Sequence, residues 1–442
     1  MRIGSGAGFS GDRLDAAVAL LERGELEVLA LECLAERTIA LAQLRRRKDP
    51  SVGYDPRLAR RIEPLLPALR KQGVRLVSNL GAANPVGAGD AIVSIARRLG
   101  IPVKVAVVTG DDVLDRIDPD ERSLEGGVPL HSYGPLVSAN AYLGADALMP
   151  ALATGADVVI TGRVADPSLF VAPIAHRYGI GLDDWDRLAR ATAVGHLLEC
   201  AGQLCGGYFA DPGRKDVAGM ADLGFPFADV DESGAAVLGK PEDSGGAITV
   251  ATATEQLLYE VTDPHGYVTP DVIADFSTVT LAQRGPDRVA VEGARGRPRP
   301  GQLKVSVGYL AGFIGEGEIG YAGRNALARA HLAAEIVRHR LASFGEMRVD
   351  LIGSTSLHGR AFDADERPYE IRLRVAARAT SADTARLVGE EVEALYTNGP
   401  AGGGGVRTSV HEQIGIVSTL IARERVPAQV TLREWAGHAQ AV

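Results

Sequence analysis

The sequence DVVITGRVADPSL, which spans Asp157–Leu169, decides the fold, because a strand pattern changes into a helix pattern within it. Residues Asp157–Ile160 contain a β-branched run of the kind that a sheet buries on both faces. A polar turn follows, and the DPS segment after it has the form of a helix start, with an N-cap and a proline. Open α/β sheets bind their ligands at the edge where such strands end. This stretch therefore predicts a parallel sheet and also the position of a site.

Arg163 lies in the turn of this stretch and would stand at the carboxyl edge of the sheet. Its guanidinium offers five donors in a fixed arrangement that suits a carboxylate or a phosphate. We predict that Arg163 binds an anionic group of a substrate and that Asp166 serves as a catalytic acid or base. The alternative is structural, with the arginine tying the turn to a neighbouring acid.

The same alternation precedes this stretch. Apolar strands end next to polar residues, and a helical pattern follows each of them: Leu26–Leu31 before Glu32, Val74–Val77 before Asn79, and Val103–Val108 before Asp112. We expect Ser138–Leu152 to be the helix that leads into the strand at Asp157. This order predicts an α/β fold with a doubly wound, mostly parallel sheet. Right-handed crossovers would bring these exits, and that of Arg163, to one edge.

The exit loops carry residues that could act in chemistry or in folding. Asp111 and Asp112 are adjacent carboxylates, which can bind a metal, or one can act as a base whose pKa the other sets. Asp112 could instead cap a following helix. Asn79 and Asn84 could pin their loop through side-chain to backbone bonds, or they could face a substrate carbonyl. We predict that Asp112 is catalytic and that the substrate-binding residues include Glu32, Asn79 and Asn84.

The chain begins with MRIGSGAGFSGDR, in which Gly6, Gly8 and Gly11 form a G-x-G-x-x-G pattern before a helical segment and a strand that ends at Glu32. This spacing resembles a dinucleotide-binding fingerprint with its acidic ribose ligand. However, Met1–Ile3 is too short for a central strand, and the pattern alone is weak in a glycine-rich chain. A glycine turn before a helix can still bind another anion through its amides. We therefore predict these glycines as substrate-binding, with a structural turn as the alternative.

A chain of 442 residues exceeds what one hydrophobic core usually serves, which predicts two domains. Residues 211–244 are rich in loop-forming residues and would end the first domain. We expect an α/β domain at 1–245 and an α+β domain at 246–442. After residue 246 the strand-helix alternation gives way to successive strands, the first at Ala247–Thr252. This succession of strands predicts an antiparallel sheet in the second domain.

Composition narrows the classes of function. The net charge is −9 and aromatic residues make up 5% of the chain, which argues against nucleic-acid binding. No apolar run approaches the length of a membrane span. The three cysteines, with no apolar leader, indicate reduced thiols and a cytoplasmic location. His196 and Cys200 would share a helix face but lack the further ligands of a zinc site, so we predict no metal.

Several strings along the chain are distinctive in combination, namely GSGAGFSGDR, SNLGAANP, VTGDD, ITGRVADPSL, HLLECAGQLCGGYF and NGPAGGGG. In this order, and over essentially the whole chain, they resemble the acyclic terpene utilisation (AtuA) family. The resemblance implies a role in the catabolism of citronellol- and geraniol-type compounds. Members of the family often occur near acyl-CoA carboxylases and other acyl-CoA enzymes. Longer relatives carry a small ferredoxin-like domain after the matched region. The resemblance thus implies either a small ferredoxin-like companion chain as a partner or a member that works without it.

We expect a catabolic enzyme that acts on a branched-chain acid or acyl-CoA, of the lyase, hydratase or hydrolase type. Arg163 would fix an anionic group, Asp112 or Asp166 would act as acid or base, and Asn79 with the glycine-loop amides would polarise a carbonyl. The sequence identifies no cofactor. Two alternatives stay open: an NAD(P)- or flavin-dependent oxidoreductase, and a non-catalytic scaffold for a carboxylase or a small partner subunit. We expect a homo-oligomer with no nucleic-acid or membrane partner.

Overall fold

The computed structural model describes residues 1–359 and 368–437. In these residues the chain forms two compact units. Unit 1 comprises Met1–His131, Leu136–Gly308 and the described part of Ile416–Val442, and unit 2 comprises Ser132–Pro135 and the described part of Tyr309–Gly415. The boundary expected after residue 245 falls inside unit 1, because residues 246–308 pack with the amino-terminal part of the chain.

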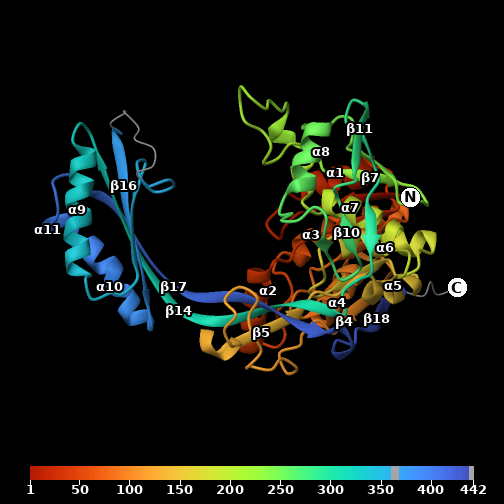
Figure 1. Ribbon diagram of the computed structural model, residues 1–442, viewed down its shortest axis with the longest axis horizontal. Helices are drawn as coiled ribbons and strands as arrows, with labels where there is room; N and C mark the ends of the chain where they lie inside the picture. Colours follow the sequence, from red (N-terminus) through yellow and green to blue (C-terminus); the bar gives the residue numbers. More distant parts are fainter. Residues whose placement is uncertain (360–367, 438–442) are drawn as a thin grey trace. The chain divides into compact units, whose positions relative to one another are not determined.

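Unit 1, which contains the strands labelled β4, β7, β11 and β18 in Figure 1, is built on a mixed sheet. The strand order is β11-β12-β8-β7-β1-β2-β3-β6-β4-β18. The central strands are parallel, in the order β1 (Arg2–Ser5), β2 (Val28–Leu31), β3 (Arg75–Ser78), β6 (Val158–Thr161) and β4 (Val103–Thr109). The flanking strands are antiparallel: β7 (Phe227–Val230), β8 (Ala236–Gly239), β11 (Thr280–Gly285), β12 (Arg288–Glu292) and β18 (Gln429–Trp435). The predicted doubly wound α/β class is confirmed for the centre of this sheet.

Helices cover both faces of the parallel strands. One face packs against α1 (Asp15–Arg23), α3 (Leu58–Gln72) and α4 (Pro85–Leu99), which share a core with alternate strand residues such as Leu76, Val105 and Ile160. The other face packs against α5 (Ala145–Ala153), α6 (Ser168–Tyr178) and α7 (Trp185–Glu199). Because β3 leads into α4 while its neighbour β6 leads into α6, the winding reverses between these two strands. Such a reversal opens a crevice at the carboxyl edge of the sheet.

The first strand corrects one sequence-based argument. Met1–Ile3 was expected to be too short for a central strand, yet β1 lies inside the sheet, parallel to β2 and antiparallel to β7. Pairing on both sides stabilises a strand of four residues, because each backbone group finds a partner in a neighbouring strand.

Two further predictions were wrong in the type of element. The segment Ser138–Leu152 forms a strand, β5 (Leu136–Ala141), before α5, because it pairs with the remote strand β14 (Gln302–Ala322). The segment Ala247–Thr252 does not form a strand, because Thr249 caps α8 (Val250–Leu258) by accepting a hydrogen bond from Thr252 N at 3.1 Å. Thr249 and Thr252 thus form part of a helix start, with the reciprocal hydrogen bonds of a capping box.

Smaller elements complete unit 1. The helix α2 (Glu36–Lys48) packs against β5, and a small antiparallel sheet has the order β13 (Arg295–Arg297), β10 (Ile273–Asp275) and β9 (Tyr267–Val268). Short 3₁₀ helices lie at Ala201–Gln203, Met220–Asp222 and Arg423–Arg425, and another, Leu130–Tyr133, begins in unit 1 and ends in unit 2.

Unit 2 is the predicted antiparallel α+β part. Its sheet has the order β15 (Met347–Ile352), β16 (Glu370–Ala379), β14 and β17 (Gly404–Ala422), and it packs with α9 (Ala326–Arg340), α10 (Ala382–Glu393) and α11 (Leu395–Asn398). Ser381 caps α10 by accepting a hydrogen bond from Thr384 N at 3.1 Å. The glycine-rich run Gly315–Gly323 lies largely within β14, where Glu318 pairs with Arg372 at 3.0 Å.

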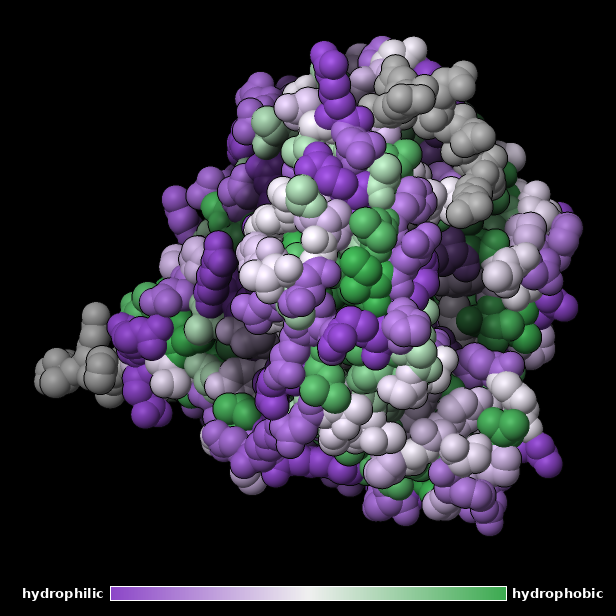
Figure 2. Space-filling view, turned by 90° about the vertical axis from the view of Figure 1, so that its left-hand side faces the viewer, coloured by the Kyte–Doolittle hydropathy of each residue, from purple (hydrophilic) through white to green (hydrophobic). Residues whose placement is uncertain are grey.

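The face of the molecule drawn in Figure 2 is mostly polar. Figure 2 shows that hydrophilic side chains cover most of the visible face, while apolar side chains gather in a narrow central patch and in smaller spots. Among residues 1–359 and 368–437, no helix has both the length and the apolar character needed to cross a membrane.

Candidate functional site

Glu32 and Asn79 connect the loops that follow β2 and β3. Asn79 Nδ2 donates to Glu32 Oε1 at 3.0 Å, and Asn79 Oδ1 accepts from Cys33 N at 2.7 Å. Both side chains are buried. Burial raises the pKa of Glu32, and the charge of nearby Arg163 opposes that rise. Asn79 thus pins the loops together, the structural alternative that the sequence left open, while the Glu32 carboxylate stays within electrostatic reach of Arg163.

Asp111 supports the loop that follows β6. Its Oδ2 accepts Arg163 N at 2.9 Å and Asn140 Nδ2 at 2.9 Å. The carboxyl is buried, and burial raises the pKa of Asp111 to about 6. Asp112, which was predicted as catalytic, is half-exposed and accepts a hydrogen bond from Gln43 Nε2 at 3.0 Å. The chain after Asp112 forms a turn rather than the helix that Asp112 could have capped.

Arg163 is buried, with its side chain 2% exposed. Its Nη1 donates to the carbonyl of Leu34, and its Nη2 lies 3.0 Å from Asp166 Oδ1. The guanidinium carbon lies 4.1 Å from the centre of the Tyr142 ring, a distance typical of a cation–π contact. Among the described residues Nε–H has no acceptor. Burial opposes the charge, but Asp166 and Tyr142 raise the pKa of Arg163, so the guanidinium stays protonated.

Glu36, at the start of α2, joins this cluster. Tyr142 donates its hydroxyl to Glu36, and Lys304 Nζ lies 3.4 Å from Glu36 Oε1. Burial alone would raise the pKa of Glu36, but the charge of Arg163 and the hydrogen bond from Tyr142 lower it to about 2. Burial likewise raises the pKa of Asp166, with the Arg163 charge opposing. The two carboxyls are therefore pushed in opposite directions, which is typical of acid–base sites.

These side chains line a cavity of about 580 Å³ in unit 1. Its polar lining includes Glu36, Tyr142, Arg163, Asp166 and Lys304, and its apolar lining includes Val268, Pro270, Leu303 and Leu420. A cavity of this size with a few polar groups in an apolar lining fits a small amphiphilic molecule. Arg163 and Asp166 are the predicted residues that the structure places in this lining.

The glycine loop lies elsewhere. Gly6 N donates to Ala30 O at 2.8 Å, and Gly8 N donates to Asp12 Oδ2 at 2.8 Å. A Cβ at Gly8 would lie 2.7 Å from the backbone carbon of Cys200. These amides already have acceptors within the protein, and glycine at position 8 lets two backbones approach closely. Gly11, Asn84 and Asp112 are also absent from the lining of the 580 Å³ cavity.

Asn84 has a structural part of its own. It is the N-cap of α4, where its side chain accepts a hydrogen bond from Gly87 N at 3.0 Å. Its Nδ2 donates to Val52 O at 3.0 Å. Both ends of the amide thus fix local backbone, one of the two readings that the sequence left open.

A buried pair next to the cavity was missed by sequence reasoning. His196 Nδ1 lies 2.9 Å from Glu199 Oε1, and the His196 ring packs 5.1 Å, centre to centre, from Tyr267, which lines the cavity. In the described part of the chain His196 Nε2 and Glu199 Oε2 have no hydrogen-bond partner. Burial raises the pKa of Glu199, and His196 opposes the rise. The i, i+3 spacing was the available signal. The described residues contain no cluster of three or more His, Cys, Asp or Glu suited to a metal ion.

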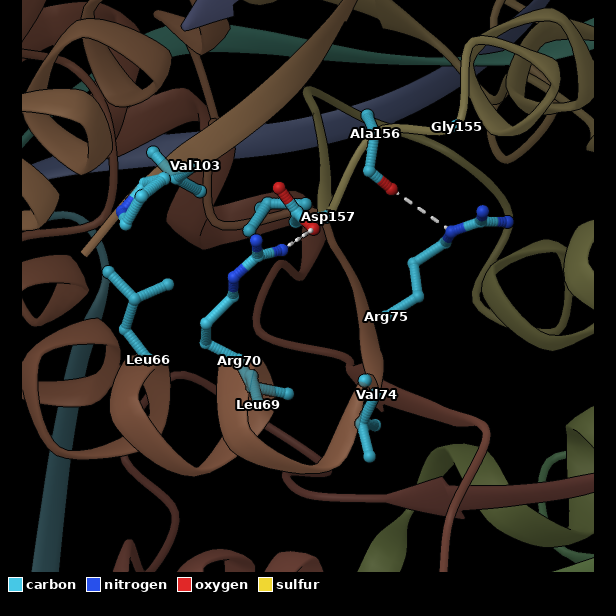
Figure 3. Close-up of a pocket in the computed structure, with 12 residues that line it drawn as sticks. Leu66, Leu69, Arg70, Val74, Arg75, Val103, Gly155, Ala156 and Asp157 are labelled. Carbon is cyan, nitrogen blue, oxygen red and sulfur yellow. Dashed lines mark hydrogen bonds and ion pairs between the residues drawn. The ribbon is translucent and has the colours of Figure 1, made fainter. Parts of the chain in front are cut away.

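A second, smaller cavity lies at the amino edge of the same strands (Figure 3). It has a volume of about 110 Å³ and is lined by residues from the starts of β3, β4 and β6. Arg70 Nη1 lies 3.4 Å from Asp157 Oδ1, and Arg75 Nε donates to Ala156 O at 3.0 Å. These polar contacts are made between protein groups at the rim of the sheet.

In a comparison with known families, the family described as acyclic terpene utilisation family protein AtuA matches residues 1–432. No curated protein and no solved structure matched the chain.

Proposed function

Because the chain belongs to the acyclic terpene utilisation (AtuA) family, we propose that it is a catabolic enzyme acting on a branched-chain acid or acyl-CoA, of the lyase, hydratase or hydrolase type. One observation carries the proposal. The 580 Å³ cavity at the carboxyl edge combines the Arg163–Asp166 pair with an apolar lining, which suits a molecule with a carboxyl or thioester head and a hydrocarbon body.

Arg163 is the group that would bind the head of the substrate. Its charge is permanent, and its Nε–H has no acceptor among the described residues. A buried donor without an acceptor costs free energy until a ligand oxygen satisfies it. Asp166 and Glu36 already compensate the cationic groups in the lining, so the site favours a carbonyl oxygen or a single carboxylate over a multiply charged anion.

Asp166 would act as the general acid or base. Burial raises its pKa above the usual range of an aspartate, and the charge of Arg163 opposes that rise. A positioned carboxyl of this kind can serve as a general acid or base. In a hydration, elimination or hydrolysis, Asp166 would move the proton of the reacting water or carbon. Arg163 would then stabilise the negative charge that builds on the carbonyl oxygen. Asp112, the other carboxyl predicted to be catalytic from the sequence, lies outside the cavity lining. A substitution of Asp112 is therefore the control for a substitution of Asp166.

A cavity-blocking variant tests the proposal. We would measure the melting temperature with branched acids, linear acids and their CoA thioesters, using the wild type, Val268→Trp and the control Val128→Trp. Val268 lines the cavity and is 63% exposed, so a larger side chain can enter it without disturbing the core. Val128, also exposed, lies outside the lining.

We expect a branched acid or its thioester to raise the melting temperature of the wild type and of Val128→Trp but not of Val268→Trp, because a ligand stabilises the state that binds it. An equal rise in both variants would remove the cavity from the proposal. A rise with NAD(P) or a flavin instead would favour the oxidoreductase alternative. The companion chain and the homo-oligomer expected from the sequence stay predictions.

A further inference from the structure

A different cavity of unit 1, of about 390 Å³, lies where α1 and α3 begin. Its lining shares no residue with that of the cavity at Arg163 and consists of Gly11, Asp12, Arg13, Leu14, Asp15, Arg57, Arg60 and Arg61. The concentration of guanidinium groups in this lining is its distinctive feature.

Most of this positive charge has no carboxylate partner. Arg13 is paired with Asp15, with Nε 3.0 Å from Oδ1. The Asp12 carboxylate accepts the backbone amides of Gly8 and Arg13. By contrast, among the described residues no carboxylate lies within 4.0 Å of the guanidinium groups of Arg57, Arg60 or Arg61. The Arg57 guanidinium instead has a neutral partner, since its Nη1 donates to Ser10 Oγ at 3.0 Å. The cavity therefore carries a net positive charge.

Arg61 supplies the independent observation that points to a ligand. Its side chain is buried, with the residue 2% exposed. Nη2 donates to the carbonyls of Ser10 and Asp12 at 2.9 Å, but Nε and Nη1 have no hydrogen-bond partner in the described part of the chain. A buried cation without a counter-charge is costly, and buried charges in proteins are normally paired. An anion in the neighbouring cavity would supply the missing charge.

The backbone around the cavity also favours a negatively charged ligand. Asp15 is the first residue of α1, and Arg57 is the N-cap of α3. Helix N-termini carry partial positive charge and amide groups without intrahelical acceptors. Together with the planar donors of the arginines, they match the oxygens of a phosphate group, which accept several charge-assisted hydrogen bonds at once.

We propose that this cavity binds a dianionic phosphate group, either free phosphate or the terminal phosphate of a small phosphorylated molecule. In this site the buried Arg61 lies beneath the phosphate, and the exposed Arg57 and Arg60 bind it from the solvent side. The anion bound near the glycine loop is thus recognised by arginine side chains rather than by the amides of Gly6 and Gly8.

Isothermal titration at fixed ionic strength tests this site, with inorganic phosphate as the first probe and ADP as the second. The variant is the double substitution Arg57→Gln/Arg60→Gln, which leaves the buried Arg61 in place. Arg97→Gln is the matched control, because Arg97 is an exposed arginine in the last turn of α4 and removes the same type of charge. Melting temperatures without phosphate check that all variants fold.

We expect phosphate to bind the wild type and Arg97→Gln alike and to bind the double variant about tenfold or more weakly, because each lost charge-assisted bond weakens binding. If phosphate competes with ADP, the ligand is a larger phosphorylated molecule; if ADP does not bind, free phosphate is the ligand. Absence of phosphate binding to the wild type, equal affinity in the double variant, or ADP binding without competition from phosphate would overturn the proposal.

Discussion

The two edges of the unit 1 sheet each carry an arginine–aspartate pair beside a cavity, but the pairs differ in burial. At the carboxyl edge the Arg163 side chain is 2% exposed and lies 3.0 Å from Asp166, next to a cavity of about 580 Å³. At the amino edge the Arg70 side chain is 55% exposed and lies 3.4 Å from Asp157, next to a cavity of about 110 Å³ (Figure 3).

The difference in burial indicates which of the two pairs can take part in chemistry. An exposed pair such as Arg70–Asp157 is screened by water and contributes roughly 0–1 kcal/mol. The buried charge of Arg163 instead lowers the pKa of Glu36 and opposes the rise that burial causes in the pKa of Asp166. Carboxyls with shifted pKa values in a cavity are a mark of functional sites. The reversal of winding between β3 and β6 opens the carboxyl edge, so the topology and the electrostatics agree.

The largest expected effect is on turnover. With a substrate identified by the melting screen, Asp166→Asn should lower kcat by about 10²–10⁴-fold, because the amide cannot exchange the proton. Asp112→Asn is the matched control and should stay within about twofold of the wild type, since that carboxyl lies outside the cavity lining. Steady-state kinetics at pH 7 gives both values. Equal losses in the two variants would remove Asp166 as the acid or base.

The second effect is on stability and compares the two edges directly. Arg163→Met should lower the free energy of unfolding by about 3–5 kcal/mol, because it leaves the buried Glu32 and the partly buried Asp166 and Glu36 without their nearby cation. Arg70→Met should change it by less than about 1 kcal/mol, because the pair is exposed. Urea denaturation of both variants measures these differences. Similar costs at the two edges would show that burial does not distinguish them.

The third effect depends on pH. Burial raises the pKa of Asp111 in the folded protein to about 6 from its ordinary value of 3.8. Above pH 6 the folded state must bury the charged form, and as the pH falls toward 4 it takes up a proton and gains stability, at most about 3 kcal/mol for a shift of this size. The stability of Asp111→Asn relative to the wild type should therefore be greatest at pH 7 and decline toward pH 4, as urea denaturation at each pH would show. A constant difference would contradict the shift.

The smallest effect concerns the glycine loop at the carboxyl edge. Gly8→Ala should lower the free energy of unfolding by about 1–3 kcal/mol, because the new methyl group meets the Cys200 backbone at 2.7 Å. Gly404→Ala is the control, since nothing lies within 4 Å of a Cβ there. Thermal melting followed by denaturant titration gives the difference. An unchanged stability in Gly8→Ala would mean that the loop has room for a ligand.

The parallel centre of the fold could be predicted because it depends on local pattern. The β-branched run before Arg163 indicates a buried strand, and helices follow in the order that right-handed crossovers require. The family membership was also foreseen and is confirmed by the match over residues 1–432. The antiparallel strands that flank the sheet could not be placed, because β7, β8, β12 and β18 pair with strands far away in sequence.

The part of the site that depends on local sequence pattern could also be predicted, and the part that depends on long-range pairing could not. Arg163 and Asp166 follow a strand and were found from it, whereas Lys304 and Leu420 reach the cavity from β14 and β17, whose positions depend on long-range pairing. Asp111 and Asp112 are alike in sequence. They differ in burial, since Asp111 is buried and accepts a hydrogen bond from Asn140 of β5, the element that the helical pattern concealed, whereas Asp112 is half-exposed.

A crystal structure of the protein with the acid or thioester that raises its melting temperature tests the central claim most directly. We predict that the carbonyl oxygen of the ligand lies within hydrogen-bond distance of Arg163 and near Asp166, with its hydrocarbon chain against Val268 and Leu303. A ligand bound in the amino-edge cavity beside Arg70, or one that touches neither Arg163 nor Asp166, would contradict it.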